Sequence, residues 1–171
     1  SCHGSPCDGL WNREHVYPRS LATPSMSTSF PNAGTDVHHI RSCDVQQNNN
    51  RGNRIFINGS GNSKAIGGNN WYPGDEWRGD VARMIMYMYL RYPTQCLPNN
   101  VGVGNVVMSD PAMIDLFLQW NAEDTVSAYE KNRNNVLEFL QGNRNPFIDN
   151  PYLATLIWSG SPAQDTWNII G

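Results

Sequence analysis

The chain has 171 residues, of which 39% are hydrophobic, and it contains six tryptophans and seven tyrosines. This length suits one domain with a sizeable core, and the apolar and aromatic content excludes a disordered chain. The net charge of −3 excludes a basic field over the whole surface, and no apolar run is long enough to span a membrane.

The N-terminal part of the chain is predicted to hold short extended segments separated by loops. Residues 11–17 favour a short strand that ends at Pro18, and residues 19–35 favour an irregular excursion without periodicity. Residues 36–40 are expected to begin a second element. Residues 44–53 are rich in Asn and Gln, which favours the start of a helix or an ordered polar loop over a strand.

A short strand over residues 54–57 and a loop or hairpin over residues 59–74 are expected next. Residues 76–91 form the strongest predicted helix. Its segment 84–90 is apolar or aromatic on every face, which is typical of a helix buried in the core. Asp80 and Arg83 are three residues apart on this helix and are expected to pair.

The C-terminal part of the chain favours three more helices. The first is predicted to begin at Ser109-Asp110-Pro111 and to run to about residue 121. The next is predicted from residue 124 or 125 to about 140, with Gly142 as its C-cap. Its expected buried face consists of Val126, Tyr129, Val136, Leu137 and Leu140. A last short helix is expected over residues 150–159, and residues 1–171 are expected to form a single domain.

Four cysteines permit three disulfide pairings. Cys2 and Cys7 would close a small loop, and Cys43 with Cys96 would tie the second segment to the far end of the predicted core helix. Zinc is the alternative, although no Cys-x-x-Cys spacing is present. Disulfides favour an exported protein. No signal peptide is visible and the sequence begins at Ser1, as expected if a signal peptide has been removed.

The most reactive residue types gather in two segments. Glu14 and His15 stand side by side, and Asn48 and Arg51 follow in the polar segment. A neutral imidazole is a suitable general base at physiological pH. Mg²⁺ prefers oxygen ligands and is often held by one or two protein groups, so a Glu with an Asn carbonyl oxygen is a sufficient set. An Arg would supply a bidentate contact to phosphate.

Several motifs, in the same order along the chain, resemble the endonuclease I family of His-Me finger (ββα-metal) nucleases. They are Glu14-His15-Val16 with Pro18, residues 36–40, Asn48-x-x-Arg51-x-Asn53, residues 78–83 and residues 141–147. The resemblance implies an α+β fold with a ββα-metal core, namely a β-hairpin followed by a helix that bears Asn48. Several helices would surround this core. The fold as a whole would be mainly helical, with a small antiparallel sheet and long loops.

The resemblance also implies chemistry. His15 would be the general base, and Glu14 and Asn48 the ligands of one Mg²⁺ ion, with Mn²⁺ or Ca²⁺ as substitutes. The family cleaves DNA, and often RNA, with little sequence preference and leaves 5′-phosphate ends. A secreted or periplasmic enzyme is therefore expected, acting as a monomer on DNA and RNA and not on a membrane.

The phosphate-binding arginine is the open point of this assignment. Some family members carry it in a long insertion between the His and Asn segments, whereas this chain has only Arg19 and Arg41 in that interval. Arg51 is assigned as the catalytic phosphate contact, with a structural ion pair as its alternative. His38 is interpreted as a structural residue, and His39 replaces an Asn common in the family.

Two other functions are alternatives to the nuclease. A catalytically silent relative would bind nucleic acid or glycans on exposed tryptophans and tyrosines, without turnover or a metal requirement. A glycan hydrolase would need two carboxylates, such as Glu14 and Glu123, about 5–10 Å apart across one cleft. Neither the spacing nor the order of the acidic residues favours the glycan hydrolase.

Overall fold

The computed structural model describes residues 9–170 and has the α+β fold that the sequence predicts. The α-helices are α1 (Val45–Arg51), α2 (Arg78–Arg91), α3 (Asp115–Glu123), α4 (Ala128–Gln141), α5 (Pro146–Asp149) and α6 (Tyr152–Trp158). The strands are β1 (Trp11–His15), β2 (Ile40–Asp44), β3 (Ile55–Phe56), β4 (Lys64–Ile66), β5 (Asn70–Tyr72), β6 (Val106–Val107) and β7 (Asp110–Ile114). Short 3-10 turns are η1 (Arg19–Leu21), η2 (Ala33–Thr35), η3 (Val37–His39) and η4 (Pro98–Asn100).

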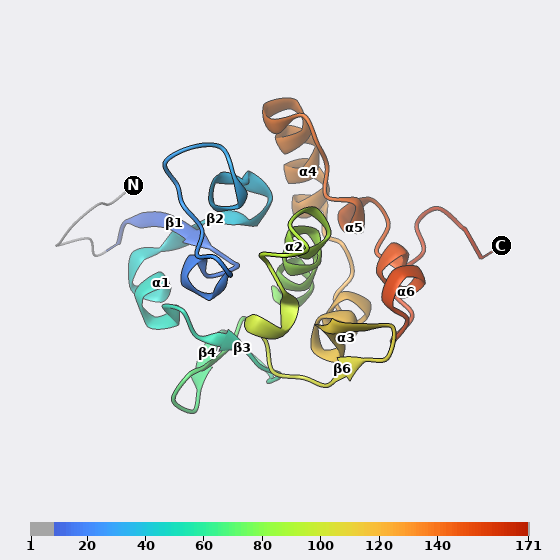
Figure 1. The fold of residues 1–171 in the computed structure, drawn as a ribbon, viewed down its shortest axis with the longest axis horizontal. Coiled ribbons are helices and arrows are strands. Elements are labelled where there is room, and N and C mark those ends of the chain that lie inside the picture. The colour runs from blue at the N-terminus through green and yellow to red at the C-terminus, as the bar shows by residue number, and fades with distance from the viewer. Residues whose placement is uncertain (1–8, 171) are drawn as a thin grey trace.

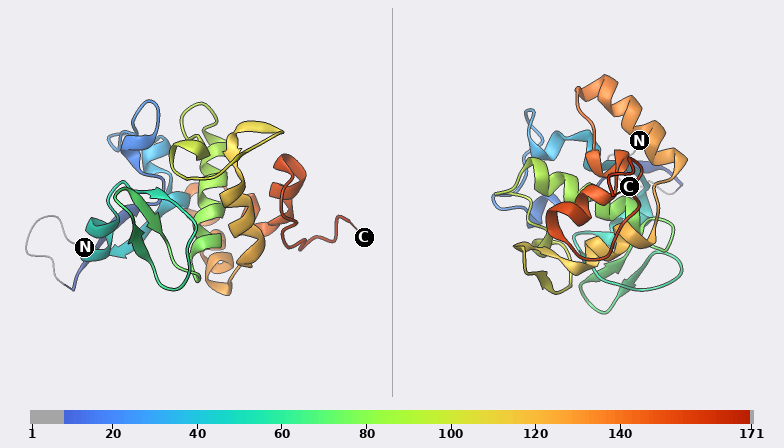
Figure 2. Two further views of the ribbon diagram at one scale, coloured as in Figure 1. Left: turned by 90° about the horizontal axis from the view of Figure 1, so that it is seen from below. Right: turned by 90° about the vertical axis from the view of Figure 1, so that its right-hand side faces the viewer.

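Helix α2 runs through the centre of the molecule, and the other elements surround it (Figure 1). All its residues from Gly79 to Met88 are buried. The prediction of a buried segment over residues 84–90 is confirmed as far as Met88 but is wrong for Leu90, which is 49% exposed near the end of the helix. The antiparallel hairpin β1–β2 lies with α1 on one side of α2, and α3, α5 and α6 lie on the other (Figure 2). The hairpin is tied to α2 by an ion pair of 2.7 Å between Arg41 and Asp80.

Two small sheets complete the fold. Strand β5 pairs in parallel with β3 and antiparallel with β4, so residues 59–74 contain the hairpin that the sequence allowed. Strands β6 and β7 form a second antiparallel hairpin. Phe56 of β3 and Trp120 of α3 meet edge to face with ring centroids 6.2 Å apart, which joins the first sheet to the core.

The helix start predicted at Ser109-Asp110-Pro111 is wrong. Asp110 and Pro111 are the first residues of β7, and α3 begins only at Asp115. The Asp110 carboxylate accepts hydrogen bonds from the Ala112 amide, the Tyr89 hydroxyl and the Trp158 indole. Its capping capacity is therefore used to fix the hairpin, and Pro111 lies on an edge strand, where a missing N–H is tolerated.

Helix α4 ends where the sequence predicts, but it begins at Ala128 instead of residue 124 or 125, and it has a different buried face. Ser127 forms a capping box with Glu130, and Gly142 is the C-cap in the left-handed conformation, with φ of 82°. Of the predicted apolar face, Leu137 is buried, whereas Tyr129, Val136 and Leu140 are exposed. The buried positions are Glu130, Asn134 and Leu137. Polar side chains bind this helix to the core, because each finds a partner there.

The predicted disulfide between Cys43 and Cys96 is wrong, since both are free thiols. Cys43 borders a cavity together with Trp77 and Val81, at the first turn of α2, whereas Cys96 follows the last turn. A helix of this length spans roughly 20 Å, and a disulfide needs Cα atoms within about 7 Å. The other predicted pair, Cys2 with Cys7, lies outside the described residues.

Among residues 9–170, no helix is both long and apolar enough to cross a membrane.

Candidate active site

The hairpin β1–β2 and helix α1 bring the candidate residues together in the ββα order expected from the resemblance. Glu14 pairs with Arg41 across the hairpin and His15 pairs with Ile40. The Asp44 side chain caps α1 by accepting from the amides of Gln46 and Gln47, and Gly52 ends it. Since neighbouring residues of a strand face opposite ways, Glu14 and His15 have different partners.

One open pocket of about 440 Å³ contains every sequence-predicted site residue. Its lining consists of Arg13, Glu14, His15, Pro18, Arg19, Ser20, Ser25, Met26, Asn48, Arg51, Gly52 and Asn53. The irregular segment after β1 therefore forms one wall, and the end of α1 forms the other.

His15 is oriented by a backbone carbonyl. Its Nε2 lies 2.9 Å from the carbonyl oxygen of Gly34, which can only accept, so Nε2 carries the proton and Nδ1 is the basic nitrogen. Burial lowers the pKa of His15, and the positive charges of Arg19 and Arg13 lower it further. The imidazole is therefore neutral at physiological pH, as a general base must be.

The turn η2 supplies this carbonyl and is itself fixed. Asn32 caps the turn, forming a capping box with Thr35. His39 donates to the preceding carbonyl, that of Ala33, at 2.9 Å and meets His15 edge to face with ring centroids 5.4 Å apart. A Cβ atom on Gly34 would lie 2.1 Å from the carbonyl oxygen of Ser27, so only glycine fits here.

Asn48 presents its amide oxygen. Its Nδ2 donates to Asn12 Oδ1 at 2.7 Å and to the carbonyl of Arg13 at 3.2 Å. Since a carbonyl oxygen can only accept, this contact identifies the amide nitrogen and leaves Oδ1 for another partner.

Glu14 is paired with Arg51. Arg51 Nη1 lies 2.8 Å from Glu14 Oε1, which leaves Oε2 for another partner. Burial raises the pKa of Glu14 to about 7, while the Arg51 charge and hydrogen bond act in the opposite direction. A cation bound at this carboxylate would favour its ionised form.

Arg51 is 5% exposed and also donates to the carbonyls of His15, Val16 and Gly52. A direct phosphate contact would need the guanidinium to leave these partners. The geometry therefore fits the structural ion pair, the alternative that the sequence left open for Arg51. The free cationic groups of the pocket are instead expected on Arg13 and Arg19, which are both exposed.

The donor set fits a hard divalent cation. A carboxylate oxygen from Glu14 and an amide oxygen from Asn48 are the ligand types that Mg²⁺ prefers, with water completing its coordination. Among the described residues, no group of three or more His, Cys, Asp or Glu side chains could hold a metal. This excludes the sulfur- and imidazole-rich sites typical of zinc within residues 9–170.

The other sequence candidates lie elsewhere. His38 is buried and its Nε2 contacts the Asn143 carbonyl at 3.0 Å, consistent with a structural role. Glu123 pairs with Arg78 at 2.9 Å, at the end of α3, and does not line either cavity that Glu14 borders. The carboxylate pair of a glycan hydrolase is therefore not assembled.

Three site residues were missed in the sequence. The place of Arg13 beside His15 could have been predicted, because residues two apart on a strand face the same way. Arg19 was noted only as one of two arginines in its interval, and Gly34 carried no signal in a segment without periodicity. Their importance depends on how residues 19–35 fold back over the hairpin.

Comparison with known proteins identifies the family of this chain. Residues 2–152 match the family model described as Endonuclease I. A relative from Bacillus amyloliquefaciens named extracellular ribonuclease is 43% identical over 164 residues, which cover 88% of this chain and 54% of the relative. A protein of the same name from Bacillus subtilis (strain 168) is 41% identical over 163 residues, with the same coverage. The chain thus spans about half the length of these curated relatives.

Proposed function

Since the chain belongs to the endonuclease I family, we propose that it hydrolyses phosphodiester bonds of nucleic acid in the pocket formed by Glu14, His15 and Asn48. Residues 1–171 would form one nuclease domain. The observation that carries the proposal is the contact between His15 Nε2 and the Gly34 carbonyl, because it leaves Nδ1 as the basic nitrogen of a side chain that lines the pocket.

His15 acts as the general base. Its Nδ1 takes a proton from a water molecule as the water oxygen forms a bond to phosphorus. The bond from phosphorus to the 3′ oxygen breaks, and that oxygen takes a proton from solvent. The products are a 5′-phosphate and a 3′-hydroxyl end.

Glu14 and Asn48 would hold a single Mg²⁺ ion. When bound, this ion supplies Lewis-acid stabilisation of the charge that develops on the phosphate and the leaving oxygen. Arg51 serves as a positioning residue, because its ion pair with Glu14 fixes the carboxylate near Asn48. Asn12 does the same for the Asn48 amide.

Arg13 and Arg19 are proposed as the phosphate contacts in place of Arg51. Both line the pocket, and both lower the pKa of His15 through their positive charge. The Nε of Arg19 donates to the Met26 carbonyl at 3.1 Å, which orients the end of its guanidinium. An arginine held in this way suits bidentate binding of a phosphate.

The substrates are proposed to be DNA and RNA. RNA is favoured by the name extracellular ribonuclease that both relatives carry, and the same name supports secretion of this protein. Backbone phosphate is common to both nucleic acids, and a site built on one carboxylate, one amide and two arginines reads no base by itself.

The test is digestion of supercoiled plasmid and of single-stranded RNA by the purified protein, with Mg²⁺ and with EDTA. Cleavage that EDTA abolishes is expected. Asn48→Ala should lower the rate at low Mg²⁺ more than at high Mg²⁺, whereas the exposed neighbour Asn49→Ala should leave it unchanged. Cleavage unaffected by EDTA would contradict the metal mechanism, and binding without cleavage would favour the silent binding module.

A further inference from the structure

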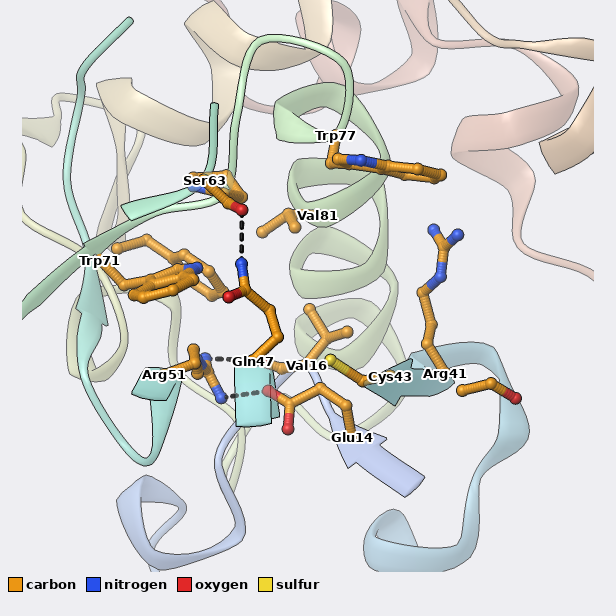
Figure 3. A pocket seen from close by; sticks show the side chains of 13 residues that line it. Glu14, Val16, Arg41, Cys43, Gln47, Arg51, Ser63, Trp71, Trp77 and Val81 are labelled. Carbon is orange, nitrogen blue, oxygen red and sulfur yellow. Dashed lines mark hydrogen bonds and ion pairs between the residues drawn. The ribbon is translucent and has the colours of Figure 1, made fainter. Parts of the chain in front are cut away.

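The ion pair of Glu14 with Arg51 also borders a second cavity, of about 250 Å³, which His15 does not line. It lies between the hairpin, α1, β5 and α2 (Figure 3). We call it the indole pocket, lined by Glu14, Val16, Arg41, Ser42, Cys43, Gln47, Arg51, Phe56, Ser63, Trp71, Pro73, Trp77 and Val81. None of these residues apart from Glu14 and Arg51 is used in the proposed hydrolysis.

The walls of the indole pocket are flat and largely apolar. Trp71 and Trp77 form two sides, and Val16 and Val81 lie between them in front of α2 (Figure 3). Burial raises the pKa of the Cys43 thiol, so this side chain adds no charge to the lining. Such a lining binds a planar apolar group by stacking and by displacing water.

Polar groups stand at fixed places on this lining. The Gln47 side chain crosses the pocket from α1, and its Nε2 donates to the Ser63 hydroxyl, which leaves the amide oxygen for a ligand. The Arg41 guanidinium lies 4.6 Å from the Trp77 ring centroid and 5.0 Å from that of Tyr129, and its ion pair with Asp80 fixes it there. An amide edge and a guanidinium plane beside aromatic rings are the groups with which proteins recognise unstacked bases.

The volume and position limit what can bind. Sites for drug-sized ligands measure about 300–1,000 Å³, so a cavity slightly smaller than these takes one small planar group. Because Glu14 and Arg51 line both cavities, a nucleotide next to the scissile phosphate would be placed to insert its base here.

We propose that the indole pocket binds one unstacked nucleobase of a single strand, on the nucleotide beside the phosphodiester that is cut. This inference rests on the proposed nuclease function and adds a preference for single strands. A base inside a duplex would have to leave its stack to enter.

The test uses a single-stranded oligonucleotide with one cleavable phosphodiester between nuclease-resistant linkages. Versions without the base on either neighbouring nucleotide are compared with the complete one. Removing the base on one side is expected to lower kcat/KM of the wild type by about five-fold or more, the value of one stacked base. Trp77→Ala should lose this discrimination, and Trp77→Phe should retain most of it.

Trp167→Ala is the matched control, since Trp167 is 55% exposed in the C-terminal segment and should leave the discrimination at the wild-type value. Equal cleavage of all versions by the wild type, or full discrimination by Trp77→Ala, would overturn the proposal. If Trp77→Ala does not fold, Gln47→Leu replaces it, with reduced preference between bases as the expected result.

A binding measurement separates this proposal from the proposed function. The affinity of the His15→Ala protein for the same labelled oligonucleotides is measured with Mg²⁺, where no turnover is needed. The base should increase affinity by a similar factor, and the added Trp77→Ala change should remove the increase. No cleavage by the wild type together with this binding difference would refute the nuclease and keep the pocket, while equal affinities would refute the pocket.

Discussion

At the scale of single residues, the orientation of His15 depends on a glycine 19 positions away in the chain. The Gly34 carbonyl holds Nε2, and the space beside its Cα is filled by the Ser27 carbonyl. The neighbouring carbonyl of η2, that of Ala33, accepts a hydrogen bond from His39. The orientation of the His15 imidazole is therefore as well fixed as the turn η2.

Gly34→Ala is expected to lower kcat by ten-fold or more and to destabilise the protein, because its Cβ would displace η2 by overlapping the Ser27 carbonyl. Gly68→Ala is the matched control, since its Cβ would meet no atom within 4 Å and its cleavage rate should be unchanged. Plasmid cleavage and thermal unfolding of both variants check this. A Gly34→Ala protein with wild-type kcat would show that the carbonyl does not position His15.

That Glu14, His15 and Asn48 lie together could be predicted from the sequence, whereas the residues that support them could not. These three stand in a motif order that one hairpin and one helix bring together in one pocket. The sequence does not decide the role of Arg51, because nothing in it distinguishes an arginine that binds phosphate from one that binds a buried carboxylate. Only its burial and its carbonyl partners separate these roles.

At the scale of elements, α4 shows where periodicity misleads. Its buried residue Glu130 receives two hydrogen bonds from Arg83 of α2, at 2.7 and 2.8 Å, and Arg83 is fully buried. Asn134 bonds to the Asn145 backbone in the same way. An apolar search selects the opposite side of such a helix, because its contacts to the core are made by polar groups whose partners lie far away in the chain.

Glu130→Gln is expected to lower the free energy of unfolding by about 3–5 kcal/mol, because it leaves the Arg83 charge buried without its main partner. Glu138→Gln on the same helix removes a half-exposed carboxylate that pairs with Arg144, and should cost about 1 kcal/mol or less. Urea denaturation of the two variants makes the comparison. Equal small losses would contradict a structural role for the buried pair.

At the scale of the whole molecule, buried neutral histidines make stability depend on pH. Burial lowers the pKa of His39 to about 3, and the charge of His15 lowers it too, while Asp36 and the Ala33 carbonyl act against this and Arg133 adds to it. An unfolded His39 titrates near its ordinary value of 6.5. Below that pH the unfolded chain binds a proton that the folded chain excludes, so stability is lost as pH falls from about 6.5 toward 3.

His39→Asn is expected to flatten this dependence by about 1.4 kcal/mol per pH unit between pH 6 and 4, whatever its effect at neutral pH. The free energies of unfolding of wild type and variant, measured by urea denaturation across this range, give the two slopes. Parallel slopes would show that His39 is not the source of the acid sensitivity.

The overall architecture was also largely predictable. The core helix, the ββα order and the α+β class follow from apolar pattern and motif order, both of which are local. The pairing of β3 with β5, the β6–β7 hairpin and the free Cys43 and Cys96 depend on contacts between distant segments. Such contacts leave little trace in a single sequence.

The central claim is that His15 is the general base, and the most direct measurement is kcat/KM of His15→Ala on plasmid and RNA with Mg²⁺. A loss of about 100-fold to 10,000-fold is expected, the usual contribution of a general base. The unfolding midpoint should change little, because His15 is only partly buried. A stable variant that retains full activity would contradict the account.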